Sequence, residues 1–308
     1  MSTRGRQRGV AAITAILVVA IAATIAVSML WESTLDQRRT ESSVLADQGL
    51  LYVQAAEAWA ADILRQDLVD NPDSDSFADI WAIELPPLPV DGGVIVGKLE
   101  DLQGRFNVNN LLDVEGNENP LFVAQFERLL QMLDLDPNIA GLLVDWLDAD
   151  AELRFPTGGE DAVYATAEPP YRTPNAMITT TTELMAIADL DRDAYRALEP
   201  FITALPQGTN LNVNTASAYV LASLSDELDL STAESLLYER GNAEFVDIEA
   251  SFGGLIDEET FLVIDGVSRH FLLTATVTLG ASQTTMRSVL QRDPSGVTRA
   301  IFRTLGAH

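Results

Sequence analysis

Six carboxylates crowd around one short loop near the middle of the chain. They are Asp145, Asp148, Asp150, Glu152, Glu160 and Asp161. The first three close a predicted helix, whose C-terminal end carries partial negative charge, so the cluster favours a bound cation. Calcium takes about six to eight oxygen ligands in adaptable geometry, which a flexible loop can supply. We therefore predict a calcium site formed by Asp148, Asp150, Glu160 and Asp161, with a solvated acidic loop as the alternative.

The residue types needed for nucleophilic or thiolate chemistry are scarce. The chain contains no cysteine and two histidines, His270 and His308. A Ser-His-Asp arrangement, a histidine metal triad or a thiolate site therefore has almost no material. The sequence predicts a protein that is not an enzyme; a periplasmic enzyme with a retained anchor is an alternative that only a substrate would reveal.

The segment Asn212-Val-Asn-Thr215, which precedes an apolar run over 216–224, looks like the opening of a helix-hairpin-helix unit. Such units often bind DNA, but Arg240 is the single basic residue between Asn210 and Ile264. Phosphate contacts normally need Lys or Arg, and the whole chain has a formal charge of -27. We therefore predict a packing module capped by Asn214 or Thr215, with no nucleic-acid partner. A membrane-anchored DNA receptor of the competence type is the alternative function.

The amino terminus predicts a membrane span. Three arginines, at positions 4, 6 and 8, precede an uncharged run from Val10 to Trp31. These residues rise about 33 Å as a helix, enough to cross a hydrocarbon layer of about 30 Å. Because positive charge stays on the cytoplasmic side, the N-terminus is predicted to be cytoplasmic and the rest exported. A cleaved secretory signal is the alternative.

The elements that position these residues form a split domain. Without proline between 32 and 70, the helix is predicted to continue to about Val69, and Pro72 stops it. Strand patterns follow near 94–107 and again over 271–279, 284–292 and 297–303. Between them, residues 111–265 have helical spacing, with short helices over 183–188 and 194–201.

The first residues resemble the cleavage region of type IV pilin-like precursors: Arg-Gln-Arg-Gly9 followed by Val10-Ala-Ala-Ile-Thr14. This resemblance implies that prepilin peptidase cuts after Gly9 and methylates Val10. Most members carry Glu where this chain has Thr14, and its absence is typical of the K-type minor pseudopilin of type II secretion. A carboxylate in hydrocarbon costs at least about 2.5 kcal/mol unless it is neutralised. A tip subunit has no neighbour above it to do so, and Thr14 is therefore interpreted as an assembly marker.

Several internal motifs are similar to the same K-type family. They are Gly104-Arg-Phe-Asn-Val-Asn-Asn, Asp145-Trp-Leu-Asp-Ala-Asp150, Gly159-Glu-Asp161, Pro169-Pro-Tyr171 and Leu211-Asn-Val-Asn-Thr-Ala216. The resemblance implies an α+β fold, in which a pilin-like long helix and a small antiparallel sheet are interrupted by a large, mostly helical insert. The implied domains are a leader (1–9), a transmembrane half-helix (10–31), a core (32–108), an inserted domain (109–265) with a helix-hairpin-helix-like part, and the rest of the core (266–308).

The resemblance also implies a function, a location and partners. A K-type subunit nucleates and caps the pseudopilus tip with I-type and J-type minor pseudopilins, above the major pseudopilin, to drive export of folded proteins across the outer membrane. The expected location is the inner membrane, crossed once, with a periplasmic globular part. Calcium in the helical domain is a further property of the family.

Overall fold

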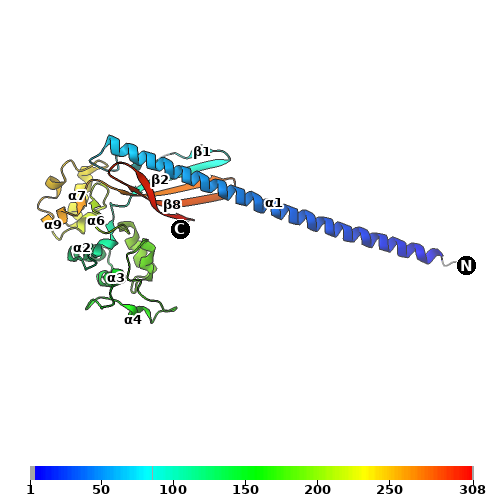
Figure 1. The fold of residues 1–308 in the computed structure, drawn as a ribbon, viewed down its shortest axis with the longest axis horizontal. Coiled ribbons are helices and arrows are strands. Elements are labelled where there is room, and N and C mark those ends of the chain that lie inside the picture. Colours follow the sequence, from blue (N-terminus) through cyan, green and yellow to red (C-terminus); the bar gives the residue numbers. More distant parts are fainter. Residues whose placement is uncertain (1–3, 85, 307–308) are drawn as a thin grey trace.

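A single helix, α1 (Arg4–Asp70), dominates the shape of the molecule (Figure 1). The computed structural model describes residues 4–84 and 86–306. At about 1.5 Å per residue α1 is about 100 Å long, and its N-terminal half projects away from the folded part (Figure 1). No proline precedes Pro72, so nothing in the sequence interrupts the helix. The helix predicted over 10–69 is confirmed, and it begins earlier, at Arg4.

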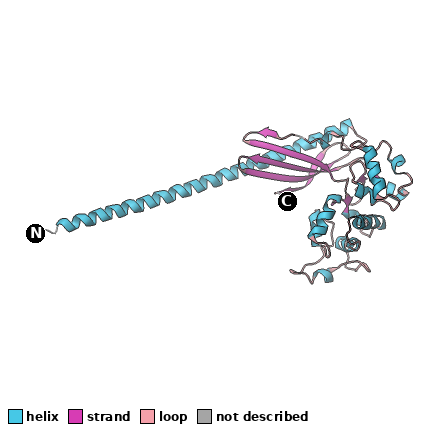
Figure 2. Cartoon of the chain, turned by 180° about the vertical axis from the view of Figure 1, so that it is seen from behind, coloured by secondary structure: helices cyan, strands magenta, loops and turns pink. Residues whose placement is uncertain are grey.

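Five antiparallel strands form one sheet in the order β1, β2, β7, β8, β9. They span Leu88–Val90, Gly93–Asp101, His270–Leu279, Ser282–Arg292 and Thr298–Leu305. Figure 2 shows the sheet lying along the C-terminal part of α1. The three predicted C-terminal strands are confirmed. The predicted strand near 94–107 is divided, because β2 ends at Asp101. Strand β1 was not predicted from the sequence, because it is short and contains a proline.

One face of the sheet packs on α1. Alternate residues of β7, among them Phe271 and Val277, are buried against Val53 and Leu64 of the helix. A short 3-10 helix, η1 (Ile80–Ala82), adds Trp81, whose ring meets the Phe271 ring edge-on with centroids 5.3 Å apart. Burial of this apolar surface is the main force that holds the helix on the sheet.

The insert between β2 and β7 contains two hydrophobic cores. The first is formed by β3 (Phe106–Asn107), η2 (Val108–Leu111), α2 (Pro120–Met132), α3 (Ile139–Leu147), α4 (Asp161–Tyr164), η3 (Thr181–Ala186), α5 (Arg192–Leu198), η4 (Glu199–Phe201) and β4 (Ile202–Thr203). The second is formed by β5 (Leu211–Asn212), α6 (Ala218–Ala222), α7 (Leu230–Arg240), α8 (Ile248–Phe252), α9 (Glu258–Phe261) and β6 (Ile264–Asp265). Phe106 and Val108, just before the predicted domain boundary at 109, pack in the first core.

The predicted caps of the hairpin-like segment are wrong. Ser217 caps α6 by accepting a hydrogen bond from the Val220 N–H. Asn214 and Thr215 lie before the helix and are buried, with side chains that bond to other segments. Their side chains are used in tertiary contacts because the chain passes through the junction between the insert and the sheet at this point.

A buried polar network holds that junction. It consists of Asp67, Asp75, Asp101, Asn212, Ser268 and Arg292, which we call the junction network. Arg292 of β8 donates to Asp75 at 2.6 Å and to Asp67 at 3.1 Å. Asp101 of β2 accepts from Ser268 at 2.6 Å and from Asn212 of the insert at 2.9 Å. The network therefore ties the end of α1, two strands and the insert together.

Candidate functional site

Three of the four predicted calcium ligands come together at the end of α3. Asp148 follows α3 with extended backbone angles, which start the loop that carries Asp150, and Glu160 closes this loop before α4. One carboxylate oxygen from each of these three residues lies within 4.8 Å of those of the other two. We call Asp148, Asp150 and Glu160 the acidic cluster.

Buried oxygens of the acidic cluster lack hydrogen-bond donors. Asp148 Oδ1 and Glu160 Oε1 are inaccessible to solvent and accept no hydrogen bond within residues 4–84 and 86–306, and the same is true of Asp145 Oδ1. Glu160 is only 8% exposed. Leaving a buried carboxylate oxygen unpaired is costly. These oxygens therefore fit a cation that supplies the missing positive charge.

The pKa values of the cluster follow from the same crowding. Burial, followed by repulsion from Asp150 and Asp145, raises the pKa of Asp148 to about 6. Burial is also the main cause that raises the pKa of Glu160 and of Asp145. A bound cation would stabilise all these carboxylates in their ionised form.

Asp161, the fourth predicted ligand, lies outside the acidic cluster. It is the first residue of α4, and its Oδ1 accepts hydrogen bonds from the Thr173 backbone N–H and hydroxyl, each at 3.2 Å. Its other oxygen lies 3.7 Å from the Arg172 guanidinium. Since its oxygens already have donors, the structure does not bring it together with the other three.

Asn175 is a candidate oxygen ligand that the sequence did not predict. Its side-chain amide donates to the backbone oxygen of Asp150, and its buried Oδ1 accepts no hydrogen bond from the described residues. No spacing pattern identifies it, because a separate loop carries it back to the cluster. Together these residues offer only oxygen ligands, which suit a hard cation such as calcium.

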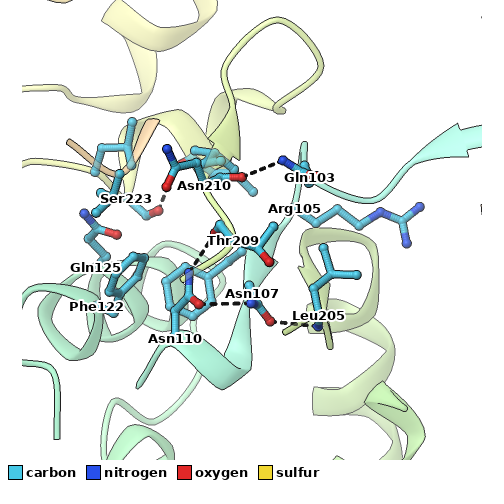
Figure 3. Close-up of a pocket in the computed structure, with 15 residues that line it drawn as sticks. Gln103, Arg105, Asn107, Asn110, Phe122, Gln125, Leu205, Thr209, Asn210 and Ser223 are labelled. Atoms are coloured by element: carbon cyan, nitrogen blue, oxygen red, sulfur yellow. Dashed lines mark hydrogen bonds between the residues drawn. The ribbon is translucent and has the colours of Figure 1, made fainter. Parts of the chain in front are cut away.

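The asparagines of the motif at 104–110 connect separate segments of the insert through hydrogen bonds. Figure 3 shows the Asn107 side chain donating to Asn110 Oδ1 at 3.0 Å and accepting from the Leu205 N–H at 2.9 Å. Asn110 donates in turn to the Thr209 carbonyl at 2.9 Å (Figure 3). The cavity that these residues line measures about 20 Å³, which is room for about one water. The asparagines are thus structural.

The hairpin-like segment offers no phosphate site in the part of the chain that the structure describes. Its basic residue, Arg240, donates to the Val213 carbonyl at 2.9 Å and lies over the rings of Phe77 and Phe245. Burial lowers its pKa to about 10. Arg240 therefore serves packing, as the predicted packing module requires.

The projecting half of α1 has the properties of a membrane anchor. It contains a window with a mean hydropathy of 2.8, none of which is buried within the molecule. Gly9 and Val10 both lie in the helix, and the Thr14 hydroxyl donates to the Ala11 carbonyl at 3.0 Å. The helix thus supplies the partner for Thr14, so this residue places no unpaired polar group in the span.

An exposed apolar half-helix whose C-terminal continuation packs on an antiparallel sheet defines a pilin-like protein with one potential anchor in the described residues. The family model described as "Type II secretion system (T2SS), protein K" matches residues 104–207 and 211–255. The type II secretion system protein K of Pseudomonas aeruginosa is 34% identical, covering 98% of this chain and 94% of its own length. That of Klebsiella pneumoniae is 30% identical and covers 93% of both chains. The chain belongs to the type II secretion system protein K family.

A solved structure supports the same assignment. This chain superposes on a chain of the GspK-GspI-GspJ complex of enterotoxigenic Escherichia coli with a TM-score of 0.79 and 26% identity, covering 88% of this chain and all of the other. The predicted α+β pilin-like fold with a helical insert is confirmed. The protein is a minor pseudopilin of type II secretion, and the DNA-receptor alternative is not favoured.

Proposed function

We propose that this minor pseudopilin forms the tip of the pseudopilus, where it nucleates and caps the filament to drive export of folded proteins. The observation that carries the proposal is the position of the insert, which lies at the end of the molecule away from the anchor (Figure 1). A body of this size above the sheet would obstruct a further subunit stacked on top. The neutral Thr14 in the anchor supports the same position, because a tip subunit has no neighbour to neutralise a carboxylate there.

The proposed partners are an I-type and a J-type minor pseudopilin beside the chain and the major pseudopilin below it. The solved relative was crystallised as a GspK-GspI-GspJ complex, which supports the first two. Immunogold labelling of assembled filaments should place this chain at one end only. Label distributed along the filament would contradict the tip position.

We infer that the chain is inserted in the inner membrane with its N-terminus in the cytoplasm and its globular part in the periplasm. Before assembly, prepilin peptidase would cut after Gly9 and methylate Val10. The basic residues before the span support this orientation. Mass spectrometry of the membrane-extracted chain should find residues 1–9 missing and one methyl group added, whereas an intact leader would exclude this processing.

We also propose that the acidic cluster binds calcium through Asp148, Asp150 and Glu160. The unpaired buried oxygens of Asp148 and Glu160 support this site, and Asn175 is a further candidate oxygen ligand. Bound calcium would join α3 to α4 and hold the intervening loop, so its role would be structural.

Metal removal tests this proposal. Calcium should raise the unfolding temperature of the metal-free full-length chain, and the chelator EGTA should reverse the gain. Asp148→Asn should abolish the calcium-dependent shift, while Asp161→Asn should retain it because Asp161 lies outside the cluster. Equal shifts in both variants and the parent chain would contradict the assignment.

We infer that the role is architectural rather than enzymatic. His270 supports this inference, because it is buried in the junction with its Nδ1 3.1 Å from Gln103 Oε1. Burial lowers its pKa to about 4. It therefore stays neutral at physiological pH and has a structural partner.

A further inference from the structure

Strand β9 forms an open edge of the sheet. It pairs with β8 on one side, and within the described residues no strand pairs with its other side. The Gly306 N–H donates to the Thr285 carbonyl at 3.0 Å. Because hydrogen-bonding direction alternates along an antiparallel strand, the main-chain groups of Arg303 and Leu305 face away from β8. Such a row of free groups is a template for an added strand.

The open edge exposes apolar side chains at close spacing. Ile301, Phe302 and Leu305 are 46%, 38% and 59% exposed. Natural edge strands usually avoid pairing by carrying charges or bulges. A register shift lies at Ile301, but Phe302 to Leu305 continue in regular register beyond it. This part of the edge is therefore both apolar and geometrically able to pair.

The sheet face opposite α1 is positive, in contrast to the chain as a whole, and its unpaired arginines lie on β8 and β9, the two strands nearest this edge. The register places Lys98, Arg287 and Arg299 on the face opposite α1, together with one carboxylate, Glu100. Three positive charges against one negative charge give +2, whereas the whole chain carries -27. Neither Arg287 nor Arg299 forms an ion pair within the described residues. Charge complementarity thus favours an acidic partner.

A cleft of about 290 Å³ lies beside the same edge. Arg287, Phe302 and Thr304 of the sheet form one side, and Thr181 and Tyr195 of the insert lie on the other. Its walls combine hydroxyl groups, an apolar ring, the guanidinium groups of Arg105 and Arg287, and the carboxylate of Glu199. Side chains that project from an added strand could therefore enter it and find both polar and apolar contacts.

We propose that the outer edge of β9 docks an extended acidic segment of a partner protein, which pairs with it as a sixth strand. Carboxylates on one face of that segment contact Arg287 and Arg299, and the main chain bonds to Arg303 and Leu305. A second copy of this chain suits the edge poorly, because it would bring like-charged arginines together. The proposal is independent of the tip position in the filament.

A synthetic peptide of about ten alternating valine and glutamate residues provides the probe. Fluorescence anisotropy with the full-length chain in detergent should show saturable, salt-sensitive binding. Arg287→Glu combined with Arg299→Glu should weaken it at least about tenfold. Leu305→Pro, which removes an outward N–H, should also weaken it. Arg38→Glu with Arg39→Glu changes the net charge equally on α1 and should leave binding unchanged.

A spin label locates the bound peptide. Because the chain has no cysteine, Ile301→Cys gives a unique attachment site, and the peptide should immobilise a label there. A label at Val246→Cys, where the native side chain is fully exposed, should not respond. The proposal is overturned if binding is absent, if the arginine double variant binds normally, if a lysine-valine peptide binds equally well, or if the chain pairs with itself through β9.

Discussion

Arg292 neutralises only part of the carboxylate charge that is buried around it. Asp67, Asp75 and Asp101 are each no more than 7% exposed. Burial is the main cause that raises the pKa of Asp67 to about 7, with repulsion from Asp75 next, despite the guanidinium 3.1 Å away. Asp67 therefore holds a proton in the folded state under mildly acidic conditions, whereas it is ionised in the unfolded chain.

This shift predicts a pH-dependent effect of Asp67→Asn. A carboxyl group whose folded pKa is raised favours folding at low pH, and this contribution is lost as pH rises from about 4 through 7. The variant should therefore gain stability relative to the parent chain between pH 5 and pH 8. Denaturation midpoints at both values measure the difference. Asp62→Asn, exposed on the same helix, is the control; an Asp67→Asn difference that does not change with pH would contradict the prediction.

The residues of the candidate metal site were predictable only where they are close in the chain. Asp148 and Asp150 follow a helix end, and Glu160 lies in the same loop, so local spacing was enough. Asn175 returns from a later loop, and Asp161 points to Thr173 because α4 begins at that residue. Whether Asn175 and Asp161 face the acidic cluster depends on the path of the loops that carry them, and no periodicity in the sequence describes that path.

At the scale of elements, the helix-to-sheet contact predicts a cost for Leu64→Ala. Leu64 is fully buried between α1 and the sheet. Its truncation should lower the free energy of unfolding by about 2 to 5 kcal/mol. Leu51→Ala is the matched control, because Leu51 lies on the same helix at 66% exposure and should change stability by no more than about 0.5 kcal/mol. Chemical denaturation of both variants measures the contrast, and equal losses would show that this contact contributes no special stability.

Elements with a regular pattern were predictable, and irregular ones were not. Alternation identified β7 and β8, since Phe271 and Val277 face α1 while Thr274 and Thr276 face away. Asn214 and Thr215 have typical cap chemistry, yet Ser217 caps α6. Asn214 and Thr215 instead form hydrogen bonds to distant segments in the junction. A local sequence window contains no information about such distant partners.

At the scale of the whole molecule, the junction network predicts how the insert is held. Arg292→Met leaves buried carboxylates without their cation and should cost about 3 to 5 kcal/mol. Hydrogen exchange should also rise around Ser268 and Asp101, where the insert joins the sheet. Arg196→Met, on an exposed pair with Asp193, is the control and should do neither. Unchanged exchange at the junction in the Arg292 variant would contradict this role.

The order in which the chain can fold follows from the pairing of β2 with β7. Gly93 lies opposite Leu279, so the centre of the sheet cannot form until the insert has been synthesised and its ends have met. The Leu102 N–H donates to the His270 carbonyl at 3.0 Å and marks that closure. Closing a long loop costs conformational entropy and slows the formation of contacts between its ends. The apolar side of α1 is therefore covered late in folding. The apolar side of α1 that contacts β7 and β8 therefore stays uncovered until these last strands are in place.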